Sequence, residues 1–480
     1  MNDFKLKILI FIAFVSLNNS AFSQVGIGTV IPDPSSVLDI SSTEKGMLAP
    51  RMTSVQRIAI VSPAEGLLVF DIDEDLFYFY DSTVWVPLES AEKRNNYKLV
   101  KSIADLADEL TAGGGSKYQL DENYMYEING TILFDFPIDL NDAYLRGHDT
   151  GEDIILNNSG SALFSGVNGG RIKDLLINGN GQQVFDITGS GTENVIFYSV
   201  VVIGASSIGA LSNLNTVYFE VFQSLSSANG LNLSNINNFY LDKGFWPASN
   251  GGTYLTLSGT FVNVQIANGR VVADGGEVGL DVSANPIITN SASLDGVSFS
   301  GLGNHVVGYT TGTYSGYSFS TDWDVDCPGI PVERDGNATG NINLDYAVGA
   351  GASTTFTGTG TSSRKKLEGN TTSTNLFRFS SVVNNRITYE GNKKRYFSVS
   401  ASLSFQGNSN NNIFIFYLSK NGTIIEETKV YREVGTNNDV GALPIVGTVE
   451  LLPNDYVEVW VERFSGTGNL LSVSLNLVAR

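Results

Sequence analysis

Asp174-Leu175-Leu176-Ile177 opens a series of short apolar triplets that recurs through the middle of the sequence and decides the fold. The later members are Val195-Ile196-Phe197, Val217-Tyr218-Phe219, Phe239-Tyr240-Leu241, Val264-Gln265-Ile266 and Val297-Ser298-Phe299. The residue before each triplet recurs at steps of 20, 22, 22, 25 and 33 residues. A repeat of this length, with one short strand per unit, indicates a solenoid whose units bury their apolar faces by stacking.

A second short strand follows most triplets after a turn rich in Gly or Ser. Two or three strands per turn, with Asn and Gly at the corners, predict a right-handed parallel β-helix. The alternative is a β-sandwich with coincidental spacing, but sandwich strands tend to recur every ~8–12 residues without this alternation of triplet and corner. We therefore predict an all-β protein with a β-helix shaft over residues 98–330.

The composition limits which partners the surface attracts. The 480 residues include 49 Asp and Glu against 29 Lys and Arg, a formal net charge of -20, and 16% of the residues are charged. Such a surface repels nucleic acid and acidic membranes, because phosphate binding needs clustered Lys and Arg. The chain is too long for one core, so about two to four domains are expected.

The first residues have the pattern of a secretory signal. Two lysines precede an apolar run, and the small residues Ala21 and Ser23 place a cleavage site before Gln24. We predict that residues 1–23 are a signal peptide and that the mature protein is secreted or lies at the cell surface. We expect no transmembrane span, because no later stretch approaches the ~18 apolar residues that a membrane helix needs.

Metal and thiol chemistry have few candidate residues. Cys327 is the only cysteine, which excludes a disulfide within one chain and a Cys-rich zinc site, and we expect it to be a buried small hydrophobe. His148 and His305 are the only histidines, and neither lies in a catalytic or metal-binding motif. We predict that the protein uses no cofactor.

Residues 24–95 form a predicted N-terminal attachment module. Its ordered blocks are Val25-Gly26-Ile27-Gly28-Thr29, Leu38-Asp39, Lys45–Met52, Gly66–Asp71 and Tyr80-Asp81. These blocks resemble the N-terminal module of secreted surface proteins of the Bacteroidetes, which is similar to the shaft-entry segments of phage tail fibres. The resemblance implies an exported, fibre-like context and brings no catalytic residues.

Within this module, residues 67–80 predict a hairpin with an acidic turn between two strands rich in aromatic and branched residues. The turn brings Asp71, Asp73 and Asp75 together, and hard cations such as calcium take several oxygens at close spacing. A calcium site is the less favoured interpretation, because the turn lacks the Gly and Glu of a calcium loop. An exposed acidic turn is the alternative.

The predicted β-helix begins with a helical cap. Ser102–Leu110 predicts a helix with Ile103, Leu106 and Leu110 on one face, and a run of three glycines ends it. Such a cap covers the apolar end and the unpaired backbone of the first turn. This helix, its Gly stop and the strands that follow from Tyr124 resemble the opening of pectin-lyase-like β-helix proteins.

The C-terminal part changes in character. Residues 331–374, rich in Gly, Ala, Thr and Asn, predict a linker or neck, and residues 375–480 predict an antiparallel jelly-roll head with eight alternating strands. Asn421-Gly422 is a favoured hairpin turn. Three blocks resemble the trimeric heads of the complement-collectin and tumour-necrosis-factor superfamily, namely Arg395–Ser400, Tyr417–Gly422 and Leu452–Trp460. The resemblance implies a homotrimer.

Glycan cleavage is the alternative chemistry, because β-helices often host polysaccharide-degrading enzymes. Arg171-Ile172-Lys173 matches one polygalacturonase motif, but the Gly-His-Gly and Asp-Asp motifs that should precede it are absent. Hydrolysis needs two carboxylates about 5–10 Å apart. Asp322, Asp324 and Asp326 share one face if their segment is extended, and Asp174 with Asp186 offers another pair. Nothing in the spacing selects either set.

We predict an exported, trimeric, fibre-type adhesin that binds a cell-surface glycan or protein through its C-terminal head and is not an enzyme. Trp323 and Trp460 are the candidate ligand-binding residues, because indole rings stack on sugars, although each is equally compatible with a core position, as is Trp246. The alternatives are a polysaccharide lyase or glycosidase, and a purely structural component of a surface or filament.

Overall fold

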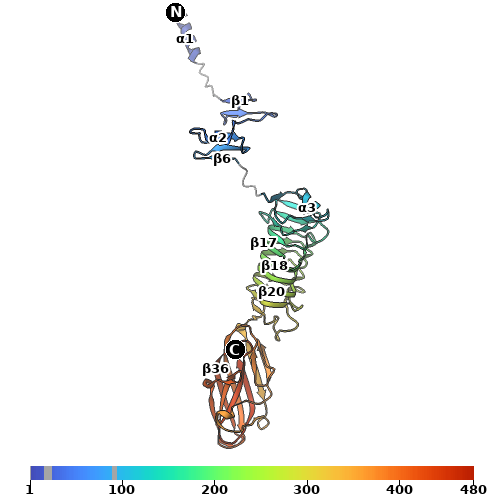
Figure 1. The fold of residues 1–480 in the computed structure, drawn as a ribbon, viewed down its shortest axis with the longest axis vertical. Coiled ribbons are helices and arrows are strands. Elements are labelled where there is room, and N and C mark those ends of the chain that lie inside the picture. The colour runs from blue at the N-terminus through green and yellow to red at the C-terminus, as the bar shows by residue number, and fades with distance from the viewer. Residues whose placement is uncertain (1, 16–23, 89–94) are drawn as a thin grey trace. The chain divides into compact units, whose positions relative to one another are not determined.

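The structure is a computed structural model that describes residues 2–15, 24–88 and 95–480. It divides into an N-terminal unit, Met1–Asn95, and a C-terminal unit, Asn96–Arg480, and each is described by itself. Strands dominate the C-terminal unit, and the described chain as a whole is an all-β protein, as predicted (Figure 1). The predicted cleavage site at Ala21 and Ser23 lies outside the described residues, as do residues 89–94 near the end of the predicted N-terminal module. None of the described helices combines the length and apolarity needed to cross a membrane.

The N-terminal unit is small and contains one four-stranded sheet, in the order β3-β4-β5-β6. The predicted hairpin is present, because β4 and β5 pair antiparallel with Leu68 opposite Phe79. The elements of this unit are α1 Asn2–Val15, β1 Val25–Ile27, β2 Leu38–Ile40, β3 Arg51–Met52, α2 Ser54–Ile58, β4 Leu68–Asp71, β5 Leu76–Tyr80 and β6 Trp85–Pro87.

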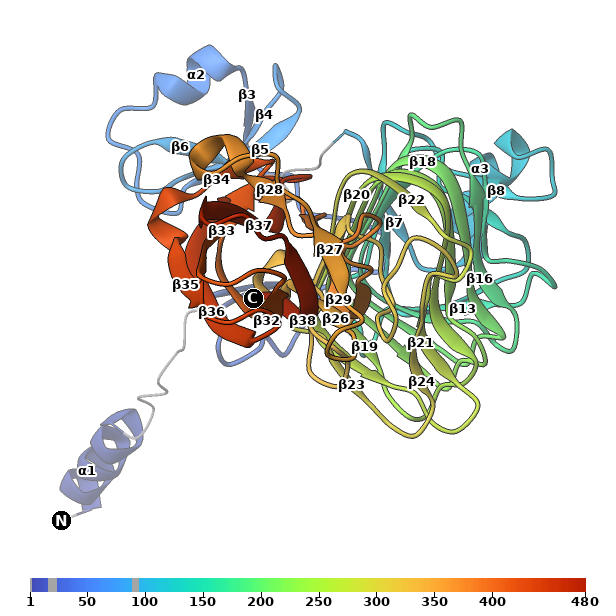
Figure 2. The same cartoon turned by 90° about the horizontal axis from the view of Figure 1, so that it is seen from below.

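A parallel β-solenoid forms the first part of the C-terminal unit, and Figure 2 shows the strands of its successive turns superposed. All of its strands belong to one 19-stranded sheet. Its elements are β7 Tyr97–Val100, η1 Ile103–Leu106, α3 Ala107–Ala112, β8 Tyr118–Gln119, β9 Met125–Ile128, β10 Thr131–Phe134, β11 Ile138–Asp139, β12 Tyr144–Arg146, β13 Ile154–Asn157, β14 Phe164–Gly166, β15 Gly170–Asn178, β16 Gln183–Thr188, β17 Asn194–Ile203, β18 Ser207–Leu225, β19 Leu231–Trp246, β20 Thr253–Val272, β21 Val278–Asp281, β22 Ile287–Asp295, β23 Ser298–Ser300, β24 Asn304–Val307 and β25 Trp323–Asp326.

The four central triplets stack as predicted, with Val195, Val217, Phe239 and Val264 opposite one another in successive turns. The first and last triplets belong to a neighbouring face instead: Leu175 stacks on Val200, and Ser298 pairs with Arg270. The prediction that all six form one column was therefore wrong. Each turn has three strand segments, and apolar triplets occur on more than one of them. The spacing of triplets along the sequence therefore does not distinguish triplets that stack in one column from triplets in a neighbouring column.

The helical cap lies where the sequence predicted it. Leu106 is buried, and Ile103 and Leu110 pack against the solenoid core. The carboxylate of Glu109 is also buried, where it accepts hydrogen bonds from Lys98 at 2.7 Å and from the Tyr126 hydroxyl at 2.8 Å. The cap thus closes the first turn with both apolar and ionic contacts.

Corners of the solenoid use the left-handed backbone conformation. One corner column contains Asp174, Ser199, Val221, Lys243, Asn268 and Gly296, all with φ between 51° and 67°. Asn and Gly adopt this conformation readily, whereas a β-branched residue is strained there. Val221, with φ of 54°, is therefore the member of the column that fits its backbone worst.

Val221→Asn is expected to stabilise the solenoid by about 1 kcal/mol, because the left-handed conformation costs ordinary L-residues about 1–2 kcal/mol and Asn less. The unfolding temperature of the purified protein measures this effect. Val167→Asn is the matched control, because Val167 is 63% exposed and is not among the residues with positive φ. A lower unfolding temperature for Val221→Asn would contradict the strain at this corner.

An antiparallel sandwich of two sheets forms the rest of the C-terminal unit. One sheet has the order β29-β26-β38-β32-β36 and the other β30-β31-β37-β33-β34, with β35 on β33. The elements are η2 Asp335–Asn337, β26 Thr339–Asp345, β27 Ala352–Thr354, η3 Gly360–Ser363, β28 Lys365–Lys366, β29 Thr372–Phe377, β30 Phe379–Ser380, β31 Ile387–Tyr389, β32 Arg395–Gly407, β33 Asn412–Lys420, β34 Thr423–Ile424, η4 Glu426–Thr428, β35 Val430–Val434, β36 Val440–Leu451, β37 Tyr456–Ser465 and β38 Leu470–Ala479.

The predicted linker over residues 331–374 differs from the structure. Strand β26 lies inside this range and pairs with both β38 and β29, and its Ile342 and Leu344 are buried in the sandwich core. The segment alternates these apolar residues with asparagines, a strand pattern that its high content of small residues obscured. The predicted Asn421-Gly422 turn is present, with Lys420 opposite Thr423 and both turn residues at positive φ.

One arginine of the sandwich is inserted into the last turn of the solenoid. Arg378 is 2% exposed, and its guanidinium donates to the Thr321 carbonyl at 2.6 Å and to the Asp335 carboxylate at 2.9 Å. Asp335 in turn accepts backbone N–H groups of Asn392 and Lys393 at 2.9 and 2.8 Å. Arg378 therefore joins the two parts of the C-terminal unit through the backbone carbonyls of Thr321 and Trp323, while its ion pair with Asp335 holds the guanidinium in place from the sandwich side.

Candidate functional site

Two rows of outward-facing side chains run along strands β17 to β20 of the solenoid, and we call them the outer strip. The first row is Ile196, Tyr218, Tyr240 and Gln265, and the second is Tyr198, Glu220, Asp242 and Ala267. In-register pairing places the members of each row on successive turns, about 4.8 Å apart. The residues between the rows, such as Phe219 and Leu241, point into the core, so the alternation of the strands fixes the strip.

A hollow of 380 Å³ lies within the outer strip. Tyr218, Tyr240 and Gln265 line one side of it, and Asp242 with Asn268 lines another. Ala267 lies between Asp242 and Asp295 in its row, and its short side chain leaves the space that a larger residue would fill. The hollow therefore follows from a change in side-chain size along a regular row.

Tyr218 and Glu220 are linked within one strand. The Tyr218 hydroxyl donates to the Glu220 carboxylate at 2.8 Å. This hydrogen bond, together with burial, raises the pKa of Tyr218 to about 12. The ring is therefore neutral and fixed in orientation at physiological pH, with its hydroxyl already occupied.

Asp242 is held in its ionised form by its neighbours. The Asn268 side chain donates to it at 2.7 Å and lowers the pKa of Asp242, against the effect of burial, and Lys243 acts in the same direction. Lys243 Nζ lies 3.1 Å from Asp242 and 3.9 Å from Glu220, and the hydrogen bond to Asp242 raises the pKa of Lys243. The site thus combines two neighbouring carboxylates with one ammonium group between them.

This arrangement is suited to holding a polyhydroxylated ligand. Aromatic rings offer flat faces, while carboxylate and amide groups accept and donate hydrogen bonds to hydroxyls. Acid–base hydrolysis needs one carboxyl whose pKa is raised so that it can protonate the leaving group. The pKa of Asp242 is shifted in the opposite direction, so Asp242 is suited to accept hydrogen bonds from a ligand and not to act as that acid.

The predicted acidic trio lies on this same face of the solenoid, further along the rows. Asp326 follows Asp295 in the second row, and Asp324 follows Ser293 in the first. Each side chain already has a partner: Asp326 pairs with Arg334, Asp324 lies 3.6 Å from Lys393, and Asp322 accepts from Ser320 at 3.2 Å. Their common face follows from the extended strand β25. The predicted alternative pair, Asp174 and Asp186, lies on two different faces, in β15 and β16.

The tryptophan predictions need correction in one case. Trp323 is 1% exposed, and its indole N–H donates to the Tyr309 hydroxyl at 2.9 Å, so it is a core residue and does not stack on a ligand. Trp246 is likewise buried, as is Cys327, whose pKa burial raises to about 11. Trp460 is half-buried and donates to Glu458 at 2.8 Å, so it stays a candidate only on its exposed side.

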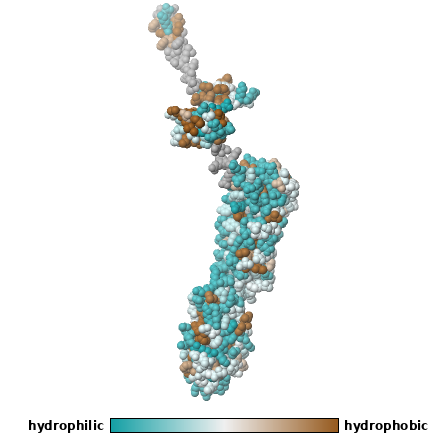
Figure 3. Space-filling view, viewed as in Figure 1, coloured by the Kyte–Doolittle hydropathy of each residue, from teal (hydrophilic) through white to brown (hydrophobic). Residues whose placement is uncertain are grey.

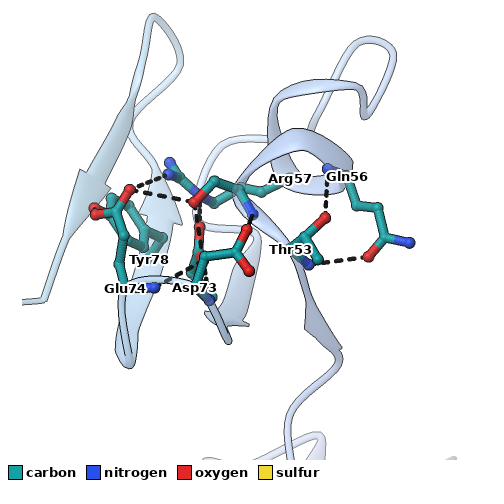
Figure 4. A network of polar contacts seen from close by, with 8 residues as sticks. Thr53, Gln56, Arg57, Asp73, Glu74 and Tyr78 are labelled. Atoms are coloured by element: carbon teal, nitrogen blue, oxygen red, sulfur yellow. Dashed lines mark hydrogen bonds and ion pairs between the residues drawn. The ribbon is translucent and has the colours of Figure 1, made fainter.

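The acidic turn of the N-terminal unit forms ion pairs with an arginine (Figure 4). Arg57, buried over the ring of Tyr78, donates to Asp71 at 2.8 Å. Burial opposes the ionised form of Asp71, but the hydrogen bonds from Arg57, Ser54 and two backbone N–H groups outweigh it and lower the pKa of Asp71. Asp73 accepts the backbone N–H of Ser54 at 3.0 Å. In the ranges that the structure describes, no group of three or more His, Cys, Asp or Glu is arranged to hold a metal ion.

The N-terminal unit leaves most of its apolar side chains exposed, and Figure 3 shows hydrophobic residues gathered on it. Over residues 24–88, the buried apolar side chains are Ala49, Val69 and Tyr78. Val30, Ile31 and Val61 are 97%, 82% and 88% exposed. So small a core beside so large an exposed apolar surface is typical of a unit that contacts another protein chain.

The middle of one face of the sandwich has no charged side chain, and the charged residues Asp345 and Glu450 lie at its ends. On the sheet that contains β32, outward residues pair Ser400 with Val446, Ser402 with Pro444, and Ser402 with Asn476. The remaining outward side chains in the middle of this face are also small or uncharged, namely Asn341, Asn343, Ser398, Ser404, Ala442, Thr448, Ser474 and Val478. Such a face suits contact with another protein surface, because no charge has to be desolvated.

Residues 26–102 match a protein family described as the phage tail-like trimerisation region. Among solved structures, the chain is similar to the enzymatically active domain of tailspike protein 4 of bacteriophage CBA120, with 10% identity, 90% of this chain and 77% of that chain covered, and a TM-score of 0.20. It is also similar to the tailspike protein of Acinetobacter phage vB_ApiP_P1, with 11% identity, 89% and 100% covered, and a TM-score of 0.25. A search among curated proteins found no match. The predicted tail-fibre-like character of the N-terminal module agrees with the family match.

Proposed function

We propose that this protein is an exported, homotrimeric, fibre-type recognition protein that works outside the cell or on a virion, and that its solenoid binds glycans through the outer strip. The observation that carries the binding role is the hollow between Tyr240 and Asp242 on the exposed face of the solenoid. The proposal moves the ligand site from the C-terminal head to the solenoid. Non-enzymatic binding is favoured over cleavage, because the neighbours of Asp242 lower its pKa, whereas the acid of a hydrolase needs a raised pKa.

The trimer rests on two surfaces that a single chain leaves open. One is the apolar surface of the N-terminal unit, whose residues match a trimerisation region. The other is the uncharged middle of the sandwich face. The chain crosses repeatedly between the two sheets of the sandwich, as from β31 to β32 to β33 and from β36 to β37 to β38, which supports a jelly-roll head of the tumour-necrosis-factor type. Three copies on one rod would strengthen weak binding through avidity.

The charge of the strip limits the ligand class. Glu220 and Asp242 repel uronic and sialic acids, whereas neutral sugars and amino sugars meet hydrogen-bond acceptors. We expect the mature protein to bind immobilised oligosaccharides with neutral or amino sugars and to release no reducing ends. We expect Tyr218→Ala combined with Tyr240→Ala to weaken binding at least tenfold, equivalent to about 1.4 kcal/mol.

Tyr431→Ala is the matched control, because Tyr431 is 53% exposed on the sandwich and lies outside the strip. Trp460→Ala tests the head as the ligand site. If Trp460→Ala abolishes binding and the double tyrosine variant does not, the ligand binds the head and the solenoid site is wrong. Release of reducing ends by the wild-type protein would favour the glycosidase alternative.

A further inference from the structure

A second groove, separate from the outer strip, lies where the solenoid meets the sandwich. It has a volume of 700 Å³ and runs between residues 313–317, near the end of the solenoid, and strand β29 of the sandwich. This volume is within the range of about 300–1,000 Å³ that is typical of small-molecule sites. We call it the junction groove.

The polar side chains of the junction groove carry no charge. They are the hydroxyls and the amide of Thr313, Ser315, Thr339, Ser373, Thr374 and Asn375. Two tyrosines, Tyr314 and Tyr317, complete the polar lining. The chain has a formal net charge of -20, yet no carboxylate lines this groove. The lining offers hydrogen-bond donors and acceptors to a ligand but no counter-ion, so it favours neutral ligands over charged ones.

The two tyrosine rings are fixed before any ligand arrives. Tyr317 stacks on Phe377 of the sandwich with ring centroids 4.0 Å apart, and Tyr314 meets the same ring edge-on at 5.5 Å. The Tyr314 hydroxyl donates to Glu390 at 2.8 Å. A rigid aromatic wall lowers the entropy lost on binding, which favours recognition of flat sugar faces.

Strand β29 adds backbone groups to the other wall. Among the described strands it pairs with β26 alone, so its second edge presents free N–H and C=O groups. Its residues from Thr372 to Asn375 are exposed. Nearby, Arg378 of the sandwich donates to the Thr321 and Trp323 carbonyls of the last solenoid turn, and these hydrogen bonds join the two walls of the groove.

We propose that the junction groove binds a neutral oligosaccharide of hexose or N-acetylhexosamine units, independently of the outer strip. Hydroxyl, amide and backbone groups satisfy the sugar hydroxyls, and the tyrosine wall packs against the sugar rings. The absence of charged side chains from the lining disfavours strong binding of uronic acids and of amino sugars with a free ammonium group. The two sites therefore differ in ligand charge, since only the outer strip offers carboxylates.

Calorimetric titration of the mature full-length protein with maltohexaose, cellohexaose and chitohexaose tests this site. Ser373→Arg places a long charged side chain in the groove, and we expect it to weaken binding at least tenfold. Ser362→Arg is the matched control, because Ser362 is exposed on η3 and does not line the groove. Because the outer strip also accepts neutral sugars, both Arg variants are compared in the Tyr218→Ala and Tyr240→Ala background, in which the groove should remain as a separate binding site with its affinity changed by less than twofold.

Several outcomes would overturn the junction site. One is that none of the three sugars binds the wild-type protein at millimolar concentration. Another is equal affinity of the Ser373→Arg and wild-type proteins. A third is loss of the trimer in Ser373→Arg by light scattering, with the Ser362→Arg protein intact, because this would assign the groove to contacts between copies. If Tyr218→Ala with Tyr240→Ala weakens the binding of these sugars and Ser373→Arg does not, all of the binding belongs to the outer strip.

Discussion

Replacing Val30, Ile31 and Val61 together by aspartate is expected to reduce the mass of the mature protein in solution from three chains to one. These side chains are 97%, 82% and 88% exposed in the single chain, within the region that matches a trimerisation family. In a trimer, each would be buried against the other copies. Nine carboxylates would then have to be desolvated without partners, at several kcal/mol for each charge in an apolar contact.

Light scattering coupled to size exclusion measures the outcome directly. The control carries three aspartates at exposed apolar positions of the C-terminal unit, Val167, Leu302 and Val382, and should stay trimeric. Circular dichroism of both variants should match the wild type, because none of the six residues belongs to a core. A monomeric wild-type protein would refute the trimer, and a trimeric Val30, Ile31 and Val61 variant would assign assembly to the sandwich face.

Arg378→Ala is expected to separate the unfolding of the sandwich from that of the solenoid. The substitution leaves Asp335 buried without its cation and removes the donor to the Thr321 carbonyl. Breaking a buried ion pair from one side costs about 3–5 kcal/mol, and the same substitution removes the hydrogen bonds from Arg378 to the Thr321 and Trp323 carbonyls of the solenoid. The contact between the two parts should therefore be lost before either part unfolds. We expect one thermal transition in the wild-type protein and two in the variant.

Arg432→Ala is the control for this experiment, because Arg432 is exposed on β35 and forms none of the ion pairs among the described residues. Arg378→Lys should recover only part of the effect, since an ammonium group cannot reproduce the planar fork that serves a carbonyl and a carboxylate together. A single unchanged transition in Arg378→Ala would mean that other contacts join the two parts.

The repeating features were predictable from sequence because each follows from local rules. Alternation identified the strands of the head, and Asn421-Gly422 specified its turn without any knowledge of the partner strand. The amphipathic pattern of residues 102–110 located the cap. Which triplets stack on one another was harder to predict. The triplets that begin at Leu175 and Val195 are similar in sequence but lie on different faces, and only their pairing partners distinguish them.

The hollow of the outer strip could not be predicted from the sequence for a related reason. Tyr218 and Tyr240 are the middle residues of two triplets, so the sequence already contained the signal that they point outward. The hollow, however, depends on Ala267 being small at a position that only the stacking register connects to Asp242. Side chains alternate between the two faces of a strand, so placing Asp322 and Asp324 on the outer face also places Trp323 on the inner face. The same alternation therefore argues against Trp323 as a ligand contact.

The in-register stacking of the solenoid has a consequence for how its length changes. Thr216 and Asn238 occupy equivalent positions in consecutive turns, and the residues on either side of them pair in the same order. Joining residue 215 directly to residue 238 would remove one whole turn and still match strand to strand, and a duplication would add one. Rods of different reach are therefore available by recombination within a single gene, with the cap, the corners and the terminal domains unchanged.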